Sequence, residues 1–248
     1  MPLDVDTAYM AGRVESYQAA LLKSVEDAAR TDLLAQYESL NTEVTDELAR
    51  LFGKHATDGK LTLTEMHRYG KLRKLNAWIA DLARDLGGTE EAFLRTQLGA
   101  LYEANAVGLS NALGIAFSGV DEARMTASVL YPWSGADFSE RVWANADKLT
   151  ATLRQTLTRG FAQGDSFARM NAAVMKATDA SVFNARRLIR TEAMFQMNAS
   201  SMDQYRKYGA ERVQCLETWD ERTCNQCAPL DGKEYAIDDA PTLPRHAC

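Results

Sequence analysis

The stretch from Arg13 to Phe52 contains neither glycine nor proline. Apolar residues recur along it in steps of three and four, with one step of five between Ala28 and Leu33. Steps of three and four place the apolar residues on one helix face, and the longer step shifts that face. The stretch therefore predicts one long helix, or two helices with a bend near residues 30–32. Such an apolar stripe needs a partner, either another helix of this chain or a neighbouring subunit.

Further helices are predicted along most of the chain, which holds only 15 glycines and 5 prolines. Thr62 and Glu65 form a capping box at the start of a helix that the glycine pair 87–88 is expected to end. Thr89 can cap the next helix. The stretch 131–135 is the clearest break in the middle of the chain. The expected helices cover residues 63–86, 90–108 or beyond, 139–161, 165 or 166 to 178, and 181–208, the last ended by Gly209.

The formal net charge of the chain is -6 and its isoelectric point is about 5.2. A general binder of nucleic acid is excluded by this balance, because duplex DNA would repel such a protein, although a local basic patch is compatible with it. A modest basic stretch is formed by Arg186, Arg187, Arg190, Arg206 and Lys207, which a solvated helix face also explains. No run is long and apolar enough to predict a membrane span, and the N-terminal residues show no secretory signal, so synthesis in a cytoplasm is expected.

All four cysteines, Cys215, Cys224, Cys227 and Cys248, lie in the last 34 residues. In a reducing cytoplasm such a cluster points to metal binding or redox chemistry more than to disulfides. Cys224 and Cys227 form a C-x-x-C pair, and His246 with Cys248 can complete a tetrahedral zinc site. Cys215 is a spare ligand. The alternative is a thiol pair without metal, whereas a thioredoxin-type site is disfavoured because no βαβ pattern surrounds the pair.

The helical period stops after Gly209, and the chain beyond it reads as a small β module. Asp231-Gly232 predicts a turn that leads into a strand at 233–237. A tail this short buries little core, so metal binding would supply its folding free energy. The predicted fold is therefore mainly α, with an elongated helical N-terminal region (1–130), a helical middle (131–209) and a small C-terminal β-hairpin zinc-binding module (210–248), an α+β arrangement.

The C-terminal sequence also carries a longer pattern. A helix with Arg190-Thr191-Glu192, Asn198, Tyr205 and Gly209 precedes the string WDERTCNQCAPLDGK at 219–233. This order resembles the phage head morphogenesis domain of the Mu F-like minor head proteins, whose pattern includes R-T-E, D-x-R-T-C-x-x-C-x-x-L-D-G-K and a final H-x-x-C-x-C. The resemblance covers about residues 138–248, including the helix of Trp143 and the turn at 163–166. The spacing of His246 and Cys248 is shorter than in that pattern.

Four polar residues of the C-terminal part allow two interpretations each. Asp220 and Arg222 flank the C-x-x-C pair and either orient the thiolates or form a polar turn. Arg190 is expected to hold the acidic turn at Asp220 or Asp231 in a bidentate pair, unless it lies on a solvated helix face with Glu192. A catalytic Glu192 in a transferase-like site is disfavoured, because no nucleophile–base pair accompanies it.

The resemblance implies a structural minor head protein, made in the host cytoplasm and located in the virion head. It implies association with the portal or the major capsid protein, in several copies or as an oligomer, and in some cases contact with the packaged DNA or exit with it. Two alternatives come from other classes of protein. One is an enzyme delivered with the genome, a transferase or a nuclease, and the other is a DNA-binding zinc module, which the acidic residues near 234–239 disfavour.

Overall fold

The computed structural model describes residues 7–68, 70–217 and 225–246. It confirms that the chain is mainly helical. Its first helical segment consists of α1 (Thr7–Ala29), a short π-helix (Arg30–Leu34) and α2 (Ala35–His55). The π-helix occupies the place of the five-residue step in the apolar stripe. Because π-helical hydrogen bonds join residues five apart, this turn absorbs one extra residue and keeps Leu33 and Leu34 buried.

The next helix begins as the sequence predicts, but the expected continuous helix over 63–86 was wrong, because Gly70 has a φ of 61° and a separate helix begins at Lys71. The capping box is present, since the backbone N–H of Thr62 donates to Glu65 Oε2 at 2.8 Å, at the start of α3 (Leu63–Arg68). The helix α4 (Lys71–Leu113) then runs through the glycine pair at 87–88, so the predicted helix end and the cap at Thr89 were wrong. A Cβ atom at Gly87 would lie 3.1 Å from the ring of Trp143, so this glycine makes room for a neighbouring helix rather than ending its own.

The remaining helices are α5 (Glu122–Val129), α6 (Phe138–Gln163) and α7 (Phe167–Lys207). The turn at 163–166 and the end at Gly209, whose φ is 76°, are as predicted. The expected break between 178 and 181 is absent, because α7 is continuous there. The hydroxyl of Thr178 donates a hydrogen bond to the carbonyl of Val174 within the same helix. A polar residue at this position therefore needs no helix end.

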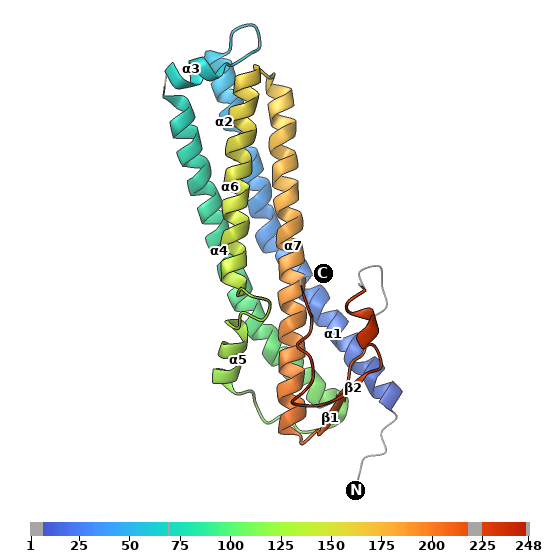
Figure 1. Cartoon of the computed structure of the whole chain (residues 1–248). Helices are drawn as coiled ribbons and strands as arrows, with labels where there is room; N and C mark the ends of the chain where they lie inside the picture. Colours follow the sequence, from blue (N-terminus) through green and yellow to red (C-terminus); the bar gives the residue numbers. More distant parts are fainter. Residues whose placement is uncertain (1–6, 69, 218–224, 247–248) are drawn as a thin grey trace. The chain divides into compact units, whose positions relative to one another are not determined.

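The helical segments form two compact units, each assembled from separated parts of the chain. Unit 2 comprises residues 28–93 and 139–186, and in it segments of α2, α4, α6 and α7 lie side by side (Figure 1). The ring of Phe52 packs edge-on against Phe167, with centroids 5.8 Å apart. Its core includes these residues without exposed surface: Leu33, Val44, Leu48, Ile79, Val142, Leu153, Leu157, Phe161 and Val174. The apolar stripe of α2 therefore finds its partners within this chain.

Unit 1 comprises residues 1–27, 94–138 and 187–248. Here α1 approaches α4 closely, since a Cβ atom at Gly108 would lie 1.8 Å from the ring of Tyr17. The core between α1, α4 and α7 is partly polar. Asn105 donates to the carbonyl of Met197 at 2.9 Å and accepts from the Gln18 amide at 3.1 Å. Satisfied buried networks of this kind fix one register of the packed helices.

The chain after α7 forms a two-stranded antiparallel sheet of β1 (Arg212–Gln214) and β2 (Glu234–Ala236), with a 3-10 turn (Ala228–Leu230) before β2. A small C-terminal β hairpin is thus present, as predicted, whereas its zinc site is not shown. The division into 1–130, 131–209 and 210–248 stays a prediction. Within the part of the chain that the structure describes, no helix has the length and apolar character needed to span a membrane.

Candidate metal centre

The cysteine-rich segment is built on the short sheet. The ladder pairs Val213 with Tyr235, and it continues beyond the strands, where the N–H of Cys215 donates to the carbonyl of Lys233 at 2.9 Å. The N–H of Gly232 in turn donates to the carbonyl of Cys215 at 2.8 Å. Gly232 has a φ of 73°, a conformation that glycine adopts without strain. The predicted turn at 231–232 is therefore present, and it holds Cys215 against the chain that follows Cys227.

Cys215 and Cys227 are both buried and neither forms a disulfide. Burial, together with the charges of Glu217, Asp231 and Cys227, raises the pKa of the Cys215 thiol to about 11. Because Cys227 contributes to this shift, the side chains of Cys215 and Cys227 lie near each other. A buried thiol among carboxylates, such as that of Cys215, stays protonated in the absence of a cation, whereas a bound divalent ion would reverse this preference.

The predicted zinc ligands are only partly within the described residues. Cys227 and His246 are described, and Cys227 is buried while His246 is partly exposed. Cys224 and Cys248 lie outside the described residues, as do Trp219, Asp220 and Arg222. Among the described side chains, no three or more of His, Cys, Asp and Glu come together as a metal site. The four-ligand set consequently remains a prediction.

Arg190 of the R-T-E motif has a structural partner that the sequence did not suggest. Its guanidinium donates to Glu26 Oε1 at 2.8 Å, which joins α7 to α1 within unit 1. Both side chains keep part of their surface in contact with water, so this ion pair adds little to stability. The expected pairing with the acidic turn stays a prediction, and one of its two carboxylates, Asp220, lies outside the described residues.

Glu192 is 1% exposed, and its Oε2 accepts a hydrogen bond from Trp133 Nε1 at 3.1 Å. The Trp133 ring is stacked on Phe195 with centroids 5.2 Å apart, and Tyr131 is stacked on the same ring at 6.2 Å. The loop at 131–135 is therefore a packing corner on α7. Glu192 anchors this corner, and its burial beneath an indole argues for a structural role rather than a catalytic one.

The sequence placed Arg206 in a basic stretch but did not show that this residue positions the β module. Arg206, in the last turn of α7, donates to Asp238 Oδ1 at 3.3 Å and to the carbonyl of Ile237 at 3.4 Å. These bonds hold the chain after β2 against the end of the helix. The only signal in the sequence was a basic residue in a final helical turn, where it also suits the helix dipole.

Comparison with known proteins supports the C-terminal pattern. Residues 151–248 match the family described as Phage Mu protein F like protein. The chain is also similar to the NAD(+)–arginine ADP-ribosyltransferase EFV of Enterococcus faecalis (strain ATCC 700802 / V583), with 26% identity over 120 residues. That alignment spans 47% of this chain but only 25% of the relative. No solved structure matches the chain.

Proposed function

Because residues 151–248 belong to the family of Mu F-like proteins of phages, we propose that this chain is a structural component of the head of a tailed phage. The family match is the observation that carries the proposal. The geometry agrees with it, since the family motif residues Arg190 and Glu192 join helices and loops within unit 1. Such residues build a scaffold, and no substrate needs to reach them.

We further propose that the protein associates with the portal or the major capsid protein, in several copies per particle. The test is co-expression with the portal and major capsid proteins of the same phage, followed by sedimentation of the assembled particles. The chain is expected to sediment with them, and a truncation before residue 212 should show whether the β module is needed. A chain that stays at the top of the gradient and is missing from purified virions would contradict the proposal.

Zinc is proposed as the ligand of the β module, held by Cys224, Cys227, His246 and Cys248. Two strands of three residues each bury too little surface to fold by themselves, so a metal would add the missing free energy. Metal analysis of the purified chain is expected to give zinc, and Cys224→Ser should abolish it. Cys215→Ser is the matched control and should keep the metal. Loss of zinc in both variants would assign Cys215 to the ligand set instead.

An enzyme is the second candidate, because the name of the curated relative describes an NAD(+)–arginine ADP-ribosyltransferase. The aligned part is one quarter of that protein, so the named activity can reside in the other three quarters. Incubation of the chain with labelled NAD(+) and an arginine-rich acceptor is expected to leave the acceptor unlabelled. Labelling that Glu192→Gln abolishes, without loss of folding, would favour the enzyme.

A further inference from the structure

One end of unit 2 is strongly basic although the whole chain is acidic. It is the end at which α2 finishes, α3 lies, α4 begins, α6 finishes and α7 begins (Figure 1). Residues 54–74 hold six Lys and Arg against two Asp and Glu, and residues 159–169 hold two Arg against one Asp. We call this surface the basic end, and its cations are Lys54, Lys60, Arg68, Lys71, Arg73, Lys74, Arg159 and Arg169.

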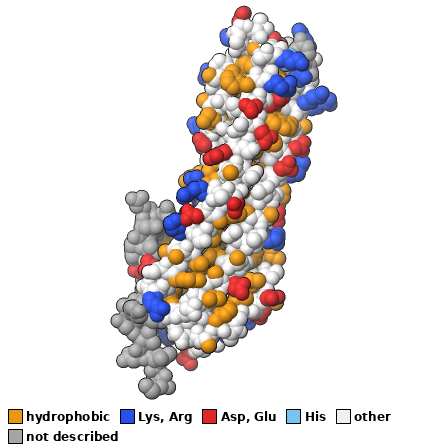
Figure 2. Space-filling model, turned by 180° about the vertical axis from the view of Figure 1, so that it is seen from behind, with side chains coloured by type: hydrophobic (Ala, Val, Ile, Leu, Met, Phe, Trp, Pro, Cys, Tyr) orange, Lys and Arg blue, Asp and Glu red, His pale blue; other side chains and the backbone are white. Residues whose placement is uncertain are grey.

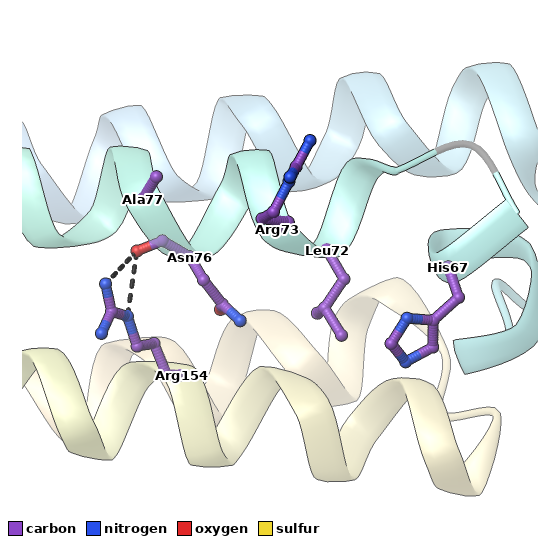
Figure 3. Close-up of a pocket in the computed structure, with 6 residues that line it drawn as sticks. All are labelled: His67, Leu72, Arg73, Asn76, Ala77 and Arg154. Atoms are coloured by element: carbon purple, nitrogen blue, oxygen red, sulfur yellow. Dashed lines mark hydrogen bonds between the residues drawn. The ribbon is translucent and has the colours of Figure 1, made fainter.

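These segments are held together by specific contacts. Lys60 forms a β-bridge with Thr57 and another with Ser166, which joins the loop after α2 to the turn before α7. Arg154 of α6 donates to the carbonyl of Asn76 on α4 at 2.6 and 2.9 Å (Figure 3). Arg154 and Arg73 line the same hollow of about 460 Å³. Arg73 of α4 and Arg154 of α6 therefore place positive charge from two helices at one hollow.

The acidic residues at this end leave most of the cations uncompensated. Glu65 accepts hydrogen bonds from the backbone and the hydroxyl of Thr62, and Asp165 pairs with Arg169 at 3.2 Å. In the part of the chain that the structure describes, no ion pair joins Lys71, Arg73 or Lys74 to a carboxylate. Figure 2 shows the Lys and Arg side chains gathered at the upper right, over α3 and the start of α4.

The start of α4 is an unfavourable place for cations. A helix N-terminus carries a partial positive charge that stabilises acidic residues, yet the first turn of α4 contains no acid and includes Lys71, Arg73 and Lys74. Helix stability therefore does not explain these side chains. The same dipole attracts an external anion, and its effect adds to that of the basic side chains.

The surface fits a phosphate backbone better than an acidic protein. Protein interfaces centre on buried aromatic and large apolar anchors and are poor in lysine. None of the exposed large apolar residues of the described chain lies between 54 and 74 or between 154 and 169. Backbone contacts to DNA need only Lys and Arg, and they carry no base specificity.

We propose that the basic end of unit 2 binds the phosphate backbone of duplex DNA without regard to base sequence. The proposal goes beyond the role in head structure and does not depend on it. It also places DNA contact on the helical bundle, whereas the sequence had raised the zinc module as the DNA-binding part. The acidic remainder of the chain would limit the contact to this end, because it repels the duplex.

The test is fluorescence anisotropy of a labelled duplex with the full chain, at several salt concentrations. The wild type should bind with an affinity that falls steeply as salt rises. Replacing Lys71, Arg73 and Lys74 together by Gln removes up to three phosphate contacts, which lowers the slope of log K against log salt by roughly 3. At 0.1 M salt the affinity should fall at least about tenfold.

A matched control removes the same charge elsewhere on unit 2 and α7. Lys176→Gln, Arg186→Gln and Arg187→Gln together should change the affinity less than about threefold, since long-range charge effects are screened at this salt concentration. The variant at the start of α4 should melt at the wild-type temperature or above it, because the substitutions remove positive side chains that the N-terminal end of the helix dipole repels. Should that variant fail to fold, Arg68→Gln with Arg159→Gln gives the same test outside α4.

The outcomes separate the alternatives. Equal loss of DNA binding in the control would overturn the proposal and move the contact to α7. An unchanged affinity in the variant at the start of α4 would also overturn it. Absence of binding at low salt would also overturn it. Binding to vesicles rich in acidic lipid, with no binding to the duplex, would assign the basic end to a membrane surface instead.

Discussion

The buried carboxyl group of Glu90 offers the sharpest quantitative test of the fold. It lies on α4 inside unit 2, is 2% exposed, and accepts a hydrogen bond at 2.8 Å from the hydroxyl of Tyr37 on α2. Its second oxygen, Oε1, has no hydrogen-bond partner among the described residues. Burial raises the pKa of Glu90 to about 7, and the hydrogen bond from Tyr37 offsets only part of that rise.

The raised pKa makes folding depend on pH in a defined direction. The native state holds the proton up to about pH 7, whereas the unfolded chain releases it near its ordinary value of 4.5. The native state therefore binds more protons between these values, and the stabilisation present below pH 4.5 is lost as the pH rises through 7. Between pH 5 and pH 8 the free energy of unfolding should fall by about 2.5 kcal/mol from this group.

Glu90→Gln removes the titration while it keeps an acceptor for the Tyr37 hydroxyl. Urea unfolding of the wild type and the variant at pH 5, 6, 7 and 8 measures the effect as the difference between the two curves, which cancels the other titrating groups. The variant should gain about 2.5 kcal/mol relative to the wild type from pH 5 to pH 8. Curves that run parallel over this range would refute the assignment of a proton to Glu90 in the folded state.

Two other changes test the packing of unit 1. Gly108→Ala should destabilise the fold by about 1–3 kcal/mol, because the new methyl group displaces the ring of Tyr17, whereas Gly99→Ala on the same helix has open space and should stabilise it by up to about 1 kcal/mol. Thermal melting of the pair decides this. Trp133→Phe keeps an aromatic ring but leaves the buried carboxyl group of Glu192 with one hydrogen bond fewer. The free energy of unfolding, measured by chemical denaturation, should fall by about 1–3 kcal/mol. An unchanged midpoint would show that Glu192 does not need the indole.

Features set by neighbouring residues were predictable from the sequence. The capping box of Thr62 and Glu65 needs only its own four residues. The five-residue step before Leu33 predicted a shifted helix face near residues 30–32, where the structure has a π-helix, because helical phase is a local property. The glycine pair at 87–88 was misread because its role depends on Trp143, a residue of another helix. The sequence does not distinguish a glycine that ends a helix from a glycine that allows another helix to pack closely.

The candidate site shows the same limit more strongly. The cysteines and His246 were visible as a pattern, but the partners of the R-T-E motif were not. Arg190 meets Glu26, which is 164 positions away, and Glu192 meets Trp133 across 59 positions. Such pairs follow from how α1, the loop after α5 and α7 pack in unit 1. The sequence alone does not indicate which of its many charged residues form pairs in the folded chain.

The polar core of unit 1 has a practical consequence for anyone who would cut this protein down to its recognisable portion. A fragment beginning at residue 151 would retain α7. It would lose three residues that form hydrogen bonds with α7, namely Asn105, Gln18 and Glu26. The orphaned Ser201 and the carbonyl of Met197 would then face water or a foreign surface. The part of the chain that precedes residue 151 thus supplies polar contacts to α7, and expression trials should keep the two parts together.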